Sequence, residues 1–513
     1  MKRLIYFGPP GTGKTTTLLT HLEQALKEGV PPEAIAFLTF TRRARREALE
    51  RVHQVLGIEA RDLPHFRTIH SMAFKGLGLK EGDVMGRAQL NTFGEAMGLK
   101  FGANAASELA AEGINSNEMG DALLALDNLA RLRGHSIKET WTMARTGIDW
   151  HTVDHFAHSY AQYKRDTGLL DFTDVLAEFT RQKKTLDVDV AFIDEAQDLS
   201  ALQWLAALQA VESAAVQYVA GDDDQAIYRW AGAEVEVFMT LPGERRVLSK
   251  SYRLPSVIHT LSGRILTRIK SRVAKEFAPR GEGGEVRQHA NVTSLSVKSG
   301  ENWLWLVRNR YLIPPLREVL ELNSVVYTQH GFSSINETER DILYDWERLR
   351  AGKPVVAGRV RVIYKNLKTK TQVAHGFKAL PGIEDETPLT MEQLRTHHGL
   401  LADGTWYHTL NFTPERKAYY RALLRTHGTL KLAPQVQLET IHGAKGTEAP
   451  QVALFLEMSR RVWEESQRTP DEEHRVWYVG ATRAREVLHV IQGNSQWNYP
   501  LPVGGSRKKV VSD

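Results

Sequence analysis

The sequence predicts an α/β protein made of two parallel-sheet domains, each interrupted by an insertion. Short apolar runs that precede helical segments occur toward both ends of the chain, whereas residues 72–165 show helical periodicity and no strong strand pattern. The 513 residues also exceed the roughly 250–300 that one hydrophobic core supports. We therefore expect at least two domains, the first with a mainly helical insertion.

The first 70 residues carry the clearest alternation of strands and helices. The apolar run Leu4–Phe7 ends in a glycine-rich turn, and Lys14–Leu26 follows with helical spacing. A second apolar strand, Ala34–Thr39, precedes the basic helix Arg42–Val55. Because helices connect successive strands in this order, we expect a parallel sheet with helices on its faces.

Strand patterns return in the middle of the chain and near its C-terminus. The segment between them is predicted to be mixed, with short strands over Val355–Tyr364 and a polar helix over Pro414–Thr426. The later strands are predicted at Val188–Ile193, Val216–Ala220, Trp303–Val307, Val436–Thr440, Val452–Leu456 and Leu488–Ile491.

These patterns define the predicted domains. The first domain contains its helical insertion, the second contains a shorter mixed insertion, and a flexible basic tail follows. The boundaries are 1–71 with 166–244 for the first domain, 72–165 for its insertion, 245–344 with 434–503 for the second, 345–433 for its insertion and 504–513 for the tail.

Composition narrows the possible functions. The chain has no cysteine, which excludes disulfides and thiolate metal sites and fits a reducing compartment. No run approaches the roughly 18 apolar residues of a membrane span, so we expect a cytoplasmic protein without membrane contact. A net charge of +5, from 66 basic and 61 acidic residues, permits a polyanionic partner without demonstrating one.

A phosphate-binding loop lies between the first strand and the first helix. Gly8–Thr15 reads GPPGTGKT and fits the pattern G-x-x-x-x-G-K-[ST] in full. Glycines let backbone N–H groups turn toward phosphate oxygens, Lys14 reaches the β- and γ-phosphates, and the Thr15 hydroxyl binds Mg²⁺. The predicted nucleotide contacts of this segment are Gly8, Gly11, Thr12, Gly13, Lys14, Thr15 and Thr16.

An acidic pair follows the predicted strand Val188–Ile193. A carboxylate at the C-terminal end of such a strand faces the crevice where α/β sheets bind ligands. Asp194 is therefore expected to hold Mg²⁺, and Glu195 to polarise the water that attacks the γ-phosphate. Adjacent acids are often only a solvated loop, but the upstream phosphate loop favours the catalytic interpretation.

Nine segments extend this pattern through the chain. In order they are GPPGTGKT, AFLTFTRRARREAL, TIHS, DFTDV, FIDEAQD, AGDDDQAIYRWAGA, SYR, TIHGAKGTE and YVGATRA. Together they resemble the motif set of UvrD/Rep/PcrA-like superfamily 1 DNA helicases, and they span residues 8 to 484. The resemblance implies two RecA-like motor domains, ATP and Mg²⁺ as cofactors, and movement 3′ to 5′ on single-stranded DNA with unwinding of duplex.

The resemblance also implies roles around the nucleotide. Gln225 corresponds to a γ-phosphate sensor, since an amide donates to phosphate and accepts from water. Arg253 and Arg483 correspond to arginines that reach ATP from the second motor domain, so that closure of a cleft assembles the site. Tyr252 corresponds to an adenine-stacking residue and Glu448 to a ribose contact; a core tyrosine and a surface glutamate are the alternatives.

Contacts with single-stranded DNA are implied in the same way. Aromatic stacking tolerates any base, which suits a translocating motor. For Phe40 a core position is the alternative, and for the basic helix after it a solvated face. The implied DNA contacts are Thr39, Phe40, Thr41, Thr68, His70, Tyr228, Trp230, Thr440, His442 and Lys445.

Other functions stay open at this point. The closest alternative is a translocase that displaces proteins and unwinds poorly, and a more distant one is a nucleotide-switched binding module whose ATPase ignores DNA. The two arginines and Gln225 favour a hydrolytic motor over the switch. We expect a monomer that binds single strands and single-strand/duplex junctions, with protein partners contacting the shortened insertion 345–433.

Overall fold

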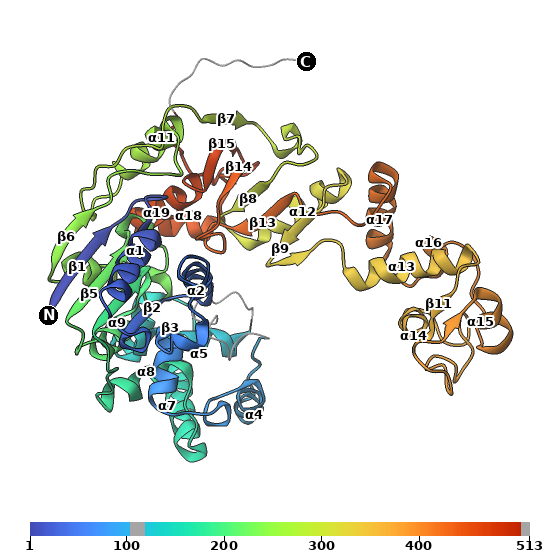
Figure 1. Ribbon diagram of the computed structural model, residues 1–513, viewed down its shortest axis with the longest axis horizontal. Helices are drawn as coiled ribbons and strands as arrows, with labels where there is room; N and C mark the ends of the chain where they lie inside the picture. The colour runs from blue at the N-terminus through green and yellow to red at the C-terminus, as the bar shows by residue number, and fades with distance from the viewer. Residues whose placement is uncertain (103–117, 504–513) are drawn as a thin grey trace. The chain divides into compact units, whose positions relative to one another are not determined.

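The structure is a computed structural model that describes residues 1–102 and 118–503 (Figure 1). The predicted basic tail, 504–513, lies outside the described residues. The chain forms two compact units. The first comprises Met1–Glu285, Glu464–Glu486 and the residues from Pro502 onward, and the second comprises Val286–Trp463 and Val487–Leu501.

A six-stranded sheet organises the first unit. Its strand order is β3-β2-β4-β5-β1-β6, and all of its pairs are parallel. The register places Thr39 beside Asp194 and Phe7 beside Gly221, so four strands end along one edge. The strands are β1 (Lys2–Phe7), β2 (Ile35–Thr39), β3 (Phe66–Thr68), β4 (Val190–Asp194), β5 (Val216–Gly221) and β6 (Glu244–Val247).

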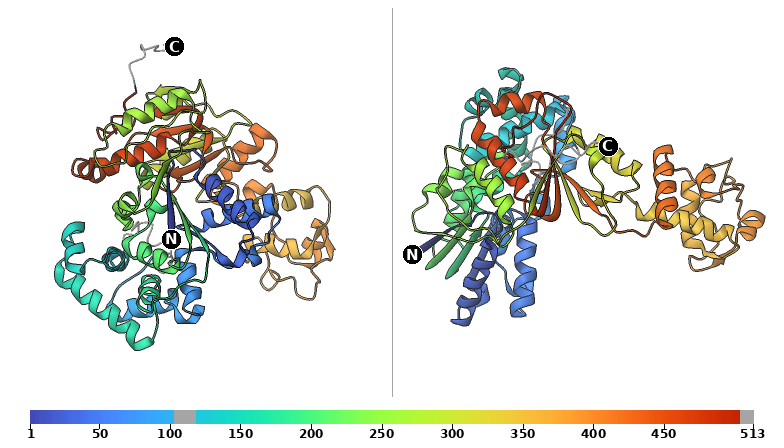
Figure 2. Two further views of the ribbon diagram at one scale, coloured as in Figure 1. Left: turned by 60° about the vertical axis from the view of Figure 1, so that its left-hand side comes forward. Right: turned by 90° about the horizontal axis from the view of Figure 1, so that it is seen from above.

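Helices cover both faces of this sheet (Figures 1 and 2). Phe37 of β2 packs on one face, in a core that includes Leu18 and Val52, and the next residue, Leu38, packs on the other. Strands buried on both faces read as continuous apolar runs, which is why the sequence revealed them. The helices are α1 (Lys14–Lys27) and α2 (Arg42–Leu56) on the first face, and α3 (Ile69–Gly76), α8 (Phe172–Arg181) and α9 (Ala201–Ala210) on the second.

Between α3 and α8 the described chain is helical, as predicted. Phe93 lies in its core, and its ring is 5.2–6.4 Å from the rings of Phe101, Phe156 and Tyr160. The helices are α4 (Arg87–Met97), α5 (Met119–Arg133), α6 (Ile137–Ala144) and α7 (Trp150–Thr167).

A buried ion-pair network ties this helical segment to the sheet domain. Arg131 of α5 contacts Asp127 at 2.7 Å, Asp171 at 2.6 Å and Asp174 at 2.9 Å. Lys164 of α7 contacts Asp171 at 2.7 Å. Since Asp171 caps the N-terminus of α8, three helices meet at these charges.

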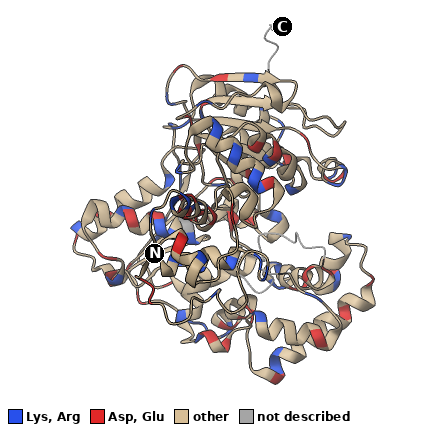
Figure 3. Ribbon diagram, turned by 90° about the vertical axis from the view of Figure 1, so that its right-hand side faces the viewer, with Lys and Arg blue, Asp and Glu red and all other residues tan. Residues whose placement is uncertain are grey.

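The remaining helices of the first unit come from two parts of the chain. Some follow strands β5 and β6, and α19 comes from residues 470–481. The helix that begins after Pro255 is α11, and it packs beside α19. Figure 3 shows basic and acidic positions interspersed along the helices, as the small net charge implies. These elements are α10 (Val235–Thr240), α11 (Ser256–Leu266) and α19 (Pro470–Ala481).

A seven-stranded sheet forms the centre of the second unit, in the order β10-β9-β13-β8-β14-β15-β7. Strands β9, β13, β8 and β14 are parallel neighbours, and β10 pairs antiparallel with β9. The elements are β7 (Glu285–His289), β8 (Trp303–Val307), α12 (Ile313–Leu322), β9 (Tyr327–Gln329), β10 (Phe332–Ser333), β13 (Val436–Thr440), β14 (Ala449–Phe455), α18 (Arg460–Ser466) and β15 (Ala484–Ile491).

The segment between β10 and β13 corrects one prediction. Of the range Val355–Tyr364, predicted to form short strands, only Val355–Val356 is a strand, and residues 357–366 form a helix. Alternating Val and Arg suggested a strand, but Ala357, Val360, Ile363 and Tyr364 are buried with helical spacing. The elements are α13 (Glu337–Arg350), β11 (Val355–Val356), α14 (Ala357–Asn366), β12 (Pro388–Leu389), α15 (Met391–His397), α16 (Trp406–Thr409) and α17 (Pro414–His427).

Two parallel-sheet domains with a helical and a mixed insertion are therefore confirmed as the fold class. The exact domain boundaries stay a prediction, because the first compact unit extends to Glu285 and takes in α19. Within residues 1–102 and 118–503, no helix is long and apolar enough to cross a membrane.

The network at Arg131 generates a stability prediction. Arg131→Met should lower the free energy of unfolding by about 3–5 kcal/mol, because it removes one of the two cations of the network and leaves Lys164 alone to balance the aspartates. Arg181→Met is the control, since Arg181 is exposed and its pair with Glu178 at 2.5 Å contributes little. Urea titrations that give equal losses for both variants would contradict the structural role of the network.

Candidate active site

The phosphate loop has the backbone geometry that its sequence predicts. Gly11 and Gly13 have φ of 72° and 82°, in the left-handed region that favours glycine. A Cβ on Gly8 would lie 2.1 Å from Cγ of Lys14, so this position accepts no larger residue. Lys14 opens α1, and its Nζ donates to the Gly8 carbonyl at 3.1 Å. The lysine thus lies across the loop, at the positive end of a helix.

Thr15 and Asp194 meet beside this loop. The Thr15 hydroxyl donates to Oδ2 of Asp194 at 2.8 Å, and the Glu195 backbone N–H donates to Oδ1 at 2.9 Å. Burial raises the pKa of Asp194 to about 6, and the neighbouring Glu195 carboxylate adds to the rise. A hydroxyl and a carboxylate are the hard oxygen ligands that Mg²⁺ prefers, so the two residues fit the predicted metal.

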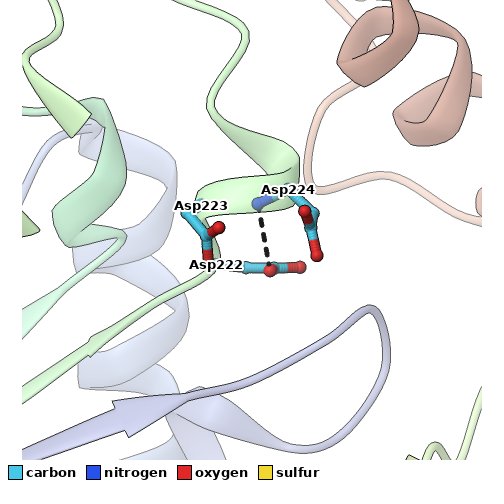
Figure 4. Close-up of side chains that lie close together, drawn as sticks. All are labelled: Asp222, Asp223 and Asp224. Carbon is cyan, nitrogen blue, oxygen red and sulfur yellow. Dashed lines mark hydrogen bonds between the residues drawn. The ribbon is translucent and has the colours of Figure 1, made fainter. Parts of the chain in front are cut away.

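Three aspartates that precede Gln225 form the acidic group of Figure 4. Asp222, Asp223 and Asp224 are buried, and their carboxylate oxygens lie within 4.8 Å of one another. The dashed line joins the Asp224 N–H to Asp222 Oδ1 at 3.3 Å. Such a group suggests a metal site by its composition, so its neighbours decide its role.

The neighbours are cations that the sequence did not reveal. Lys275 contacts Asp222 at 3.0 Å, Asp224 at 2.9 Å and Asp223. Arg272 pairs with Asp224 at 2.6 Å. Burial lowers the pKa of Lys275, but the three aspartates outweigh burial and the pKa lies above its ordinary value. A lysine ammonium therefore takes the place that a metal would occupy.

Hydrogen bonds fix both the nitrogen and the oxygen of the Gln225 side-chain amide. Its Nε2 donates to Asp222 Oδ2 at 2.7 Å, and its Oε1 accepts from Arg483 at 2.9 Å. Arg475 of α19 donates to the Asp223 carbonyl at 2.9 Å and holds the same loop. Two of the predicted catalytic residues, Gln225 and Arg483, are thus in direct contact.

The segment with Tyr252 and Arg253 lies against the phosphate loop. Ser251 donates through its hydroxyl to the Pro10 carbonyl at 2.7 Å, and the Tyr252 N–H donates to the Gly11 carbonyl at 2.8 Å. Tyr252 is 68% exposed, which excludes the alternative of a core tyrosine. Arg253 and Arg483, which the resemblance assigns to a second motor domain, belong to the same compact unit as the loop.

The threonines of the first unit that were predicted to contact single-stranded DNA either cap a helix or are buried. Thr41 accepts from the Ala44 N–H at 3.1 Å and caps α2, and Thr68 accepts from the Ser71 N–H at 3.2 Å and caps α3. Thr39 is fully buried, and its hydroxyl has no hydrogen-bond partner among the described residues. The two caps place the N-termini of α2 and α3 directly after β2 and β3.

Three predicted stacking residues form a row. The rings of Phe40 and Tyr228 are 5.7 Å apart, and those of Tyr228 and Trp230 are 6.2 Å apart. Exposure is greatest at Trp230, at 38%, whereas Phe40 packs partly against the core. The ring of His70, a further predicted DNA contact, lies edge-on to Phe172 at 6.2 Å.

Four of the predicted site residues belong to the second unit. They follow β13, where the Thr440 hydroxyl accepts from the Gly443 N–H at 3.1 Å and shapes a turn. Glu448 is exposed at the end of this turn, as either interpretation of it requires. The four residues are Thr440, His442, Lys445 and Glu448.

A phosphate loop between β1 and α1, with a carboxylate at the end of β4 hydrogen-bonded to its threonine, defines the class of P-loop nucleotide-binding proteins. The comparisons narrow this class. Residues 2–244 match the UvrD/REP helicase N-terminal domain, and residues 421–495 match the UvrD-like helicase C-terminal domain. The chain therefore belongs to the UvrD-like helicases, which confirms the resemblance of its motifs.

Curated relatives of low sequence identity also carry helicase names. A "Probable DNA helicase" of Mycoplasma pneumoniae is 25% identical over 317 residues, which are 57% of this chain and 57% of the relative. The "ATP-dependent DNA helicase PcrA" of Staphylococcus epidermidis is 25% identical over 306 residues, which are 56% of this chain and 41% of the relative. The chain thus spans about half the length of the relatives it matches.

The raised pKa of Asp194 predicts a pH-dependent stability. Below the unfolded value of 3.8 the carboxyl is neutral in both states, and its favourable contribution is lost as the pH rises through about 6. Without Mg²⁺, wild type should therefore lose on the order of 3 kcal/mol relative to Asp194→Asn between pH 4 and 7. Melting temperatures of both proteins across this range in EDTA test this, and a constant difference would contradict it.

Proposed function

We propose that this chain is an ATP-dependent DNA helicase that moves 3′ to 5′ on single-stranded DNA and unwinds duplex. One observation carries the proposal. The segment 222–230 contains Gln225, which contacts Asp222 and Arg483, and it ends at the exposed Trp230. A change at the γ-phosphate therefore has a short covalent path to the predicted stacking row.

At the nucleotide, each residue has a stated task. Lys14 and the loop N–H groups bind phosphate oxygens, and Thr15 with Asp194 would hold Mg²⁺, which would supply positive charge next to the phosphates. Glu195 accepts a proton from the attacking water. Arg253 and Arg483 stabilise charge on the transferred phosphoryl group, an effect worth roughly 10³–10⁵ in rate for such arginines.

On the DNA side, stacking supplies affinity without sequence preference. Each base–aromatic stack contributes roughly 1–3 kcal/mol, and Trp230 offers the most exposed ring of the row. The backbone N–H groups at the starts of α2 and α3 are suited to phosphate. Relatives whose names state ATP-dependent DNA helicase activity support the same assignment.

Two alternatives predict different behaviour. A translocase with weak unwinding hydrolyses ATP in a DNA-dependent way but separates duplex poorly. A nucleotide-switched binding module has a slow ATPase that DNA does not change. The direct contact between Arg483 and Gln225 favours a hydrolytic motor over the binding module.

A strand-displacement assay tests the proposal. Duplexes with a 3′ tail should be unwound in the presence of ATP and Mg²⁺, duplexes with a 5′ tail should not, and oligo-dT should stimulate ATP hydrolysis. Lys14→Ala is the negative control, because it removes the cation that lies across the phosphate loop. Unwinding only from a 5′ tail would refute the polarity, and ATPase without unwinding would support the translocase.

Trp230→Ala tests the stacking row. The concentration of oligo-dT that half-saturates ATPase stimulation should rise about tenfold or more, in line with the loss of one stack. Phe332→Ala is the matched control, since Phe332 is 80% exposed on the hairpin of the second unit. Hydrolysis without DNA is measured to check that the nucleotide site is intact, and equal DNA dependence of both variants would refute the stacking role.

A further inference from the structure

Gln197 lies two residues after Glu195, in the turn that follows β4, and is fully buried. Its amide is saturated with short bonds. Nε2 donates to Glu195 Oε2 at 2.6 Å and to Asp198 Oδ2 at 3.1 Å, and Oε1 accepts from the Asp222 backbone N–H at 2.9 Å. One side chain thus joins the predicted base to the first residue of the loop that carries Gln225.

The surrounding backbone leaves room for this amide. A Cβ on Gly221 would lie 2.8 Å from Oε1 of Gln197 and 2.8 Å from the Phe238 ring. The glycine at the end of β5 therefore permits the close approach. Glu195 itself has φ of 52°, a conformation that residues with a side chain rarely adopt. Backbone strain of this kind persists only where neighbouring contacts hold it, and the Gln197 bond is one of them.

The contacts beyond Gln197 extend to the sensor. Asp222, whose N–H binds Gln197, accepts through its carboxylate from Gln225 at 2.7 Å and pairs with Lys275 at 3.0 Å. Asp222 therefore helps to fix the orientation of both side chains. It holds Glu195 through Gln197, and it holds Gln225 directly. Because Asp222 holds both Glu195 and Gln225, the distance between these two side chains is kept when the Asp222–Gln225 loop moves.

We propose that Gln197 is a positioning residue that fixes the Glu195 carboxylate relative to the Asp222–Gln225 loop. The proposal rests on the proposed function, in which Glu195 activates water. It goes further by assigning the alignment of that base to a residue outside the set predicted from the sequence. A misplacement of about 1 Å costs roughly 10²-fold in rate, so the bond has a measurable kinetic consequence.

A buried glutamine with a purely structural role offers the matched comparison. Gln217 on β5 is also buried, accepts from Arg3 at 2.9 Å and donates to the Val211 carbonyl at 2.8 Å. Both ends of its amide are hydrogen-bonded, through two bonds where Gln197 has three, and neither bond reaches Glu195 or the Asp222–Gln225 loop. Gln217→Met therefore reports what the loss of a hydrogen-bonded buried amide does by itself.

The test is a double-mutant cycle in single-turnover ATP hydrolysis by the full chain. Gln197→Met should lower the rate about 10- to 100-fold while the Kd of a fluorescent ATP analogue stays within about threefold. In the Glu195→Gln background the same change should have less than about a threefold effect, because the group it positions is gone. Gln217→Met should leave the rate within about threefold.

Each other outcome is decisive. An equal factor in both backgrounds, or a wild-type rate for Gln197→Met, would overturn the proposal. If Gln197→Met fails to bind the analogue, Gln197→Leu replaces it, since it is a second apolar side chain that loses the donor to Glu195 and adds no charge beside it. The cycle uses hydrolysis without DNA, so an ATPase that DNA does not stimulate would refute the helicase and leave this test intact. A wild-type rate for Glu195→Gln would overturn the role of the base and this proposal with it.

Discussion

The hydrogen bond from Thr15 to Asp194 joins residues 179 positions apart, and the rest of the site is arranged around it. It requires that α1 begins where β4 ends. The parallel register meets this requirement, because β1, β2, β4 and β5 end along one edge of the sheet. Loops that leave this edge carry the phosphate loop, the acidic pair, the capping threonines and the sensor loop.

A second set of interactions holds the loop Asp222–Gln225, which carries the predicted sensor and leaves the same edge of the sheet. Gln225 receives one bond from Arg483, near the end of α19, and gives one to Asp222. Arg475 and Lys275 hold the same loop from outside the sheet. Because these groups come from segments up to 258 positions away in the chain, folding of the first unit and assembly of the site are one process.

Prediction from the sequence succeeded where information is local. The phosphate loop, the acidic pair and the buried parallel strands are contiguous patterns, and their elements appear as expected. Lys275 and Gln197 could not be assigned, because both are set apart by contacts with Asp222, which is distant from each of them in the sequence. The strand predicted over 355–364 failed for another reason: alternating Val and Arg resembled a strand, while the buried positions followed a helix. The DNA contacts stay predictions in both units.

The lysine among the three aspartates has a consequence for the electric field at the site. Three buried carboxylates next to Gln225, the predicted γ-phosphate sensor, would repel the triphosphate of an incoming nucleotide. Lys275 and Arg272 cancel most of that charge within about 3 Å, without exposing a cation that competes for phosphate. The loop can therefore use acidic side chains as rigid hydrogen-bond acceptors while it remains nearly neutral toward an anionic ligand.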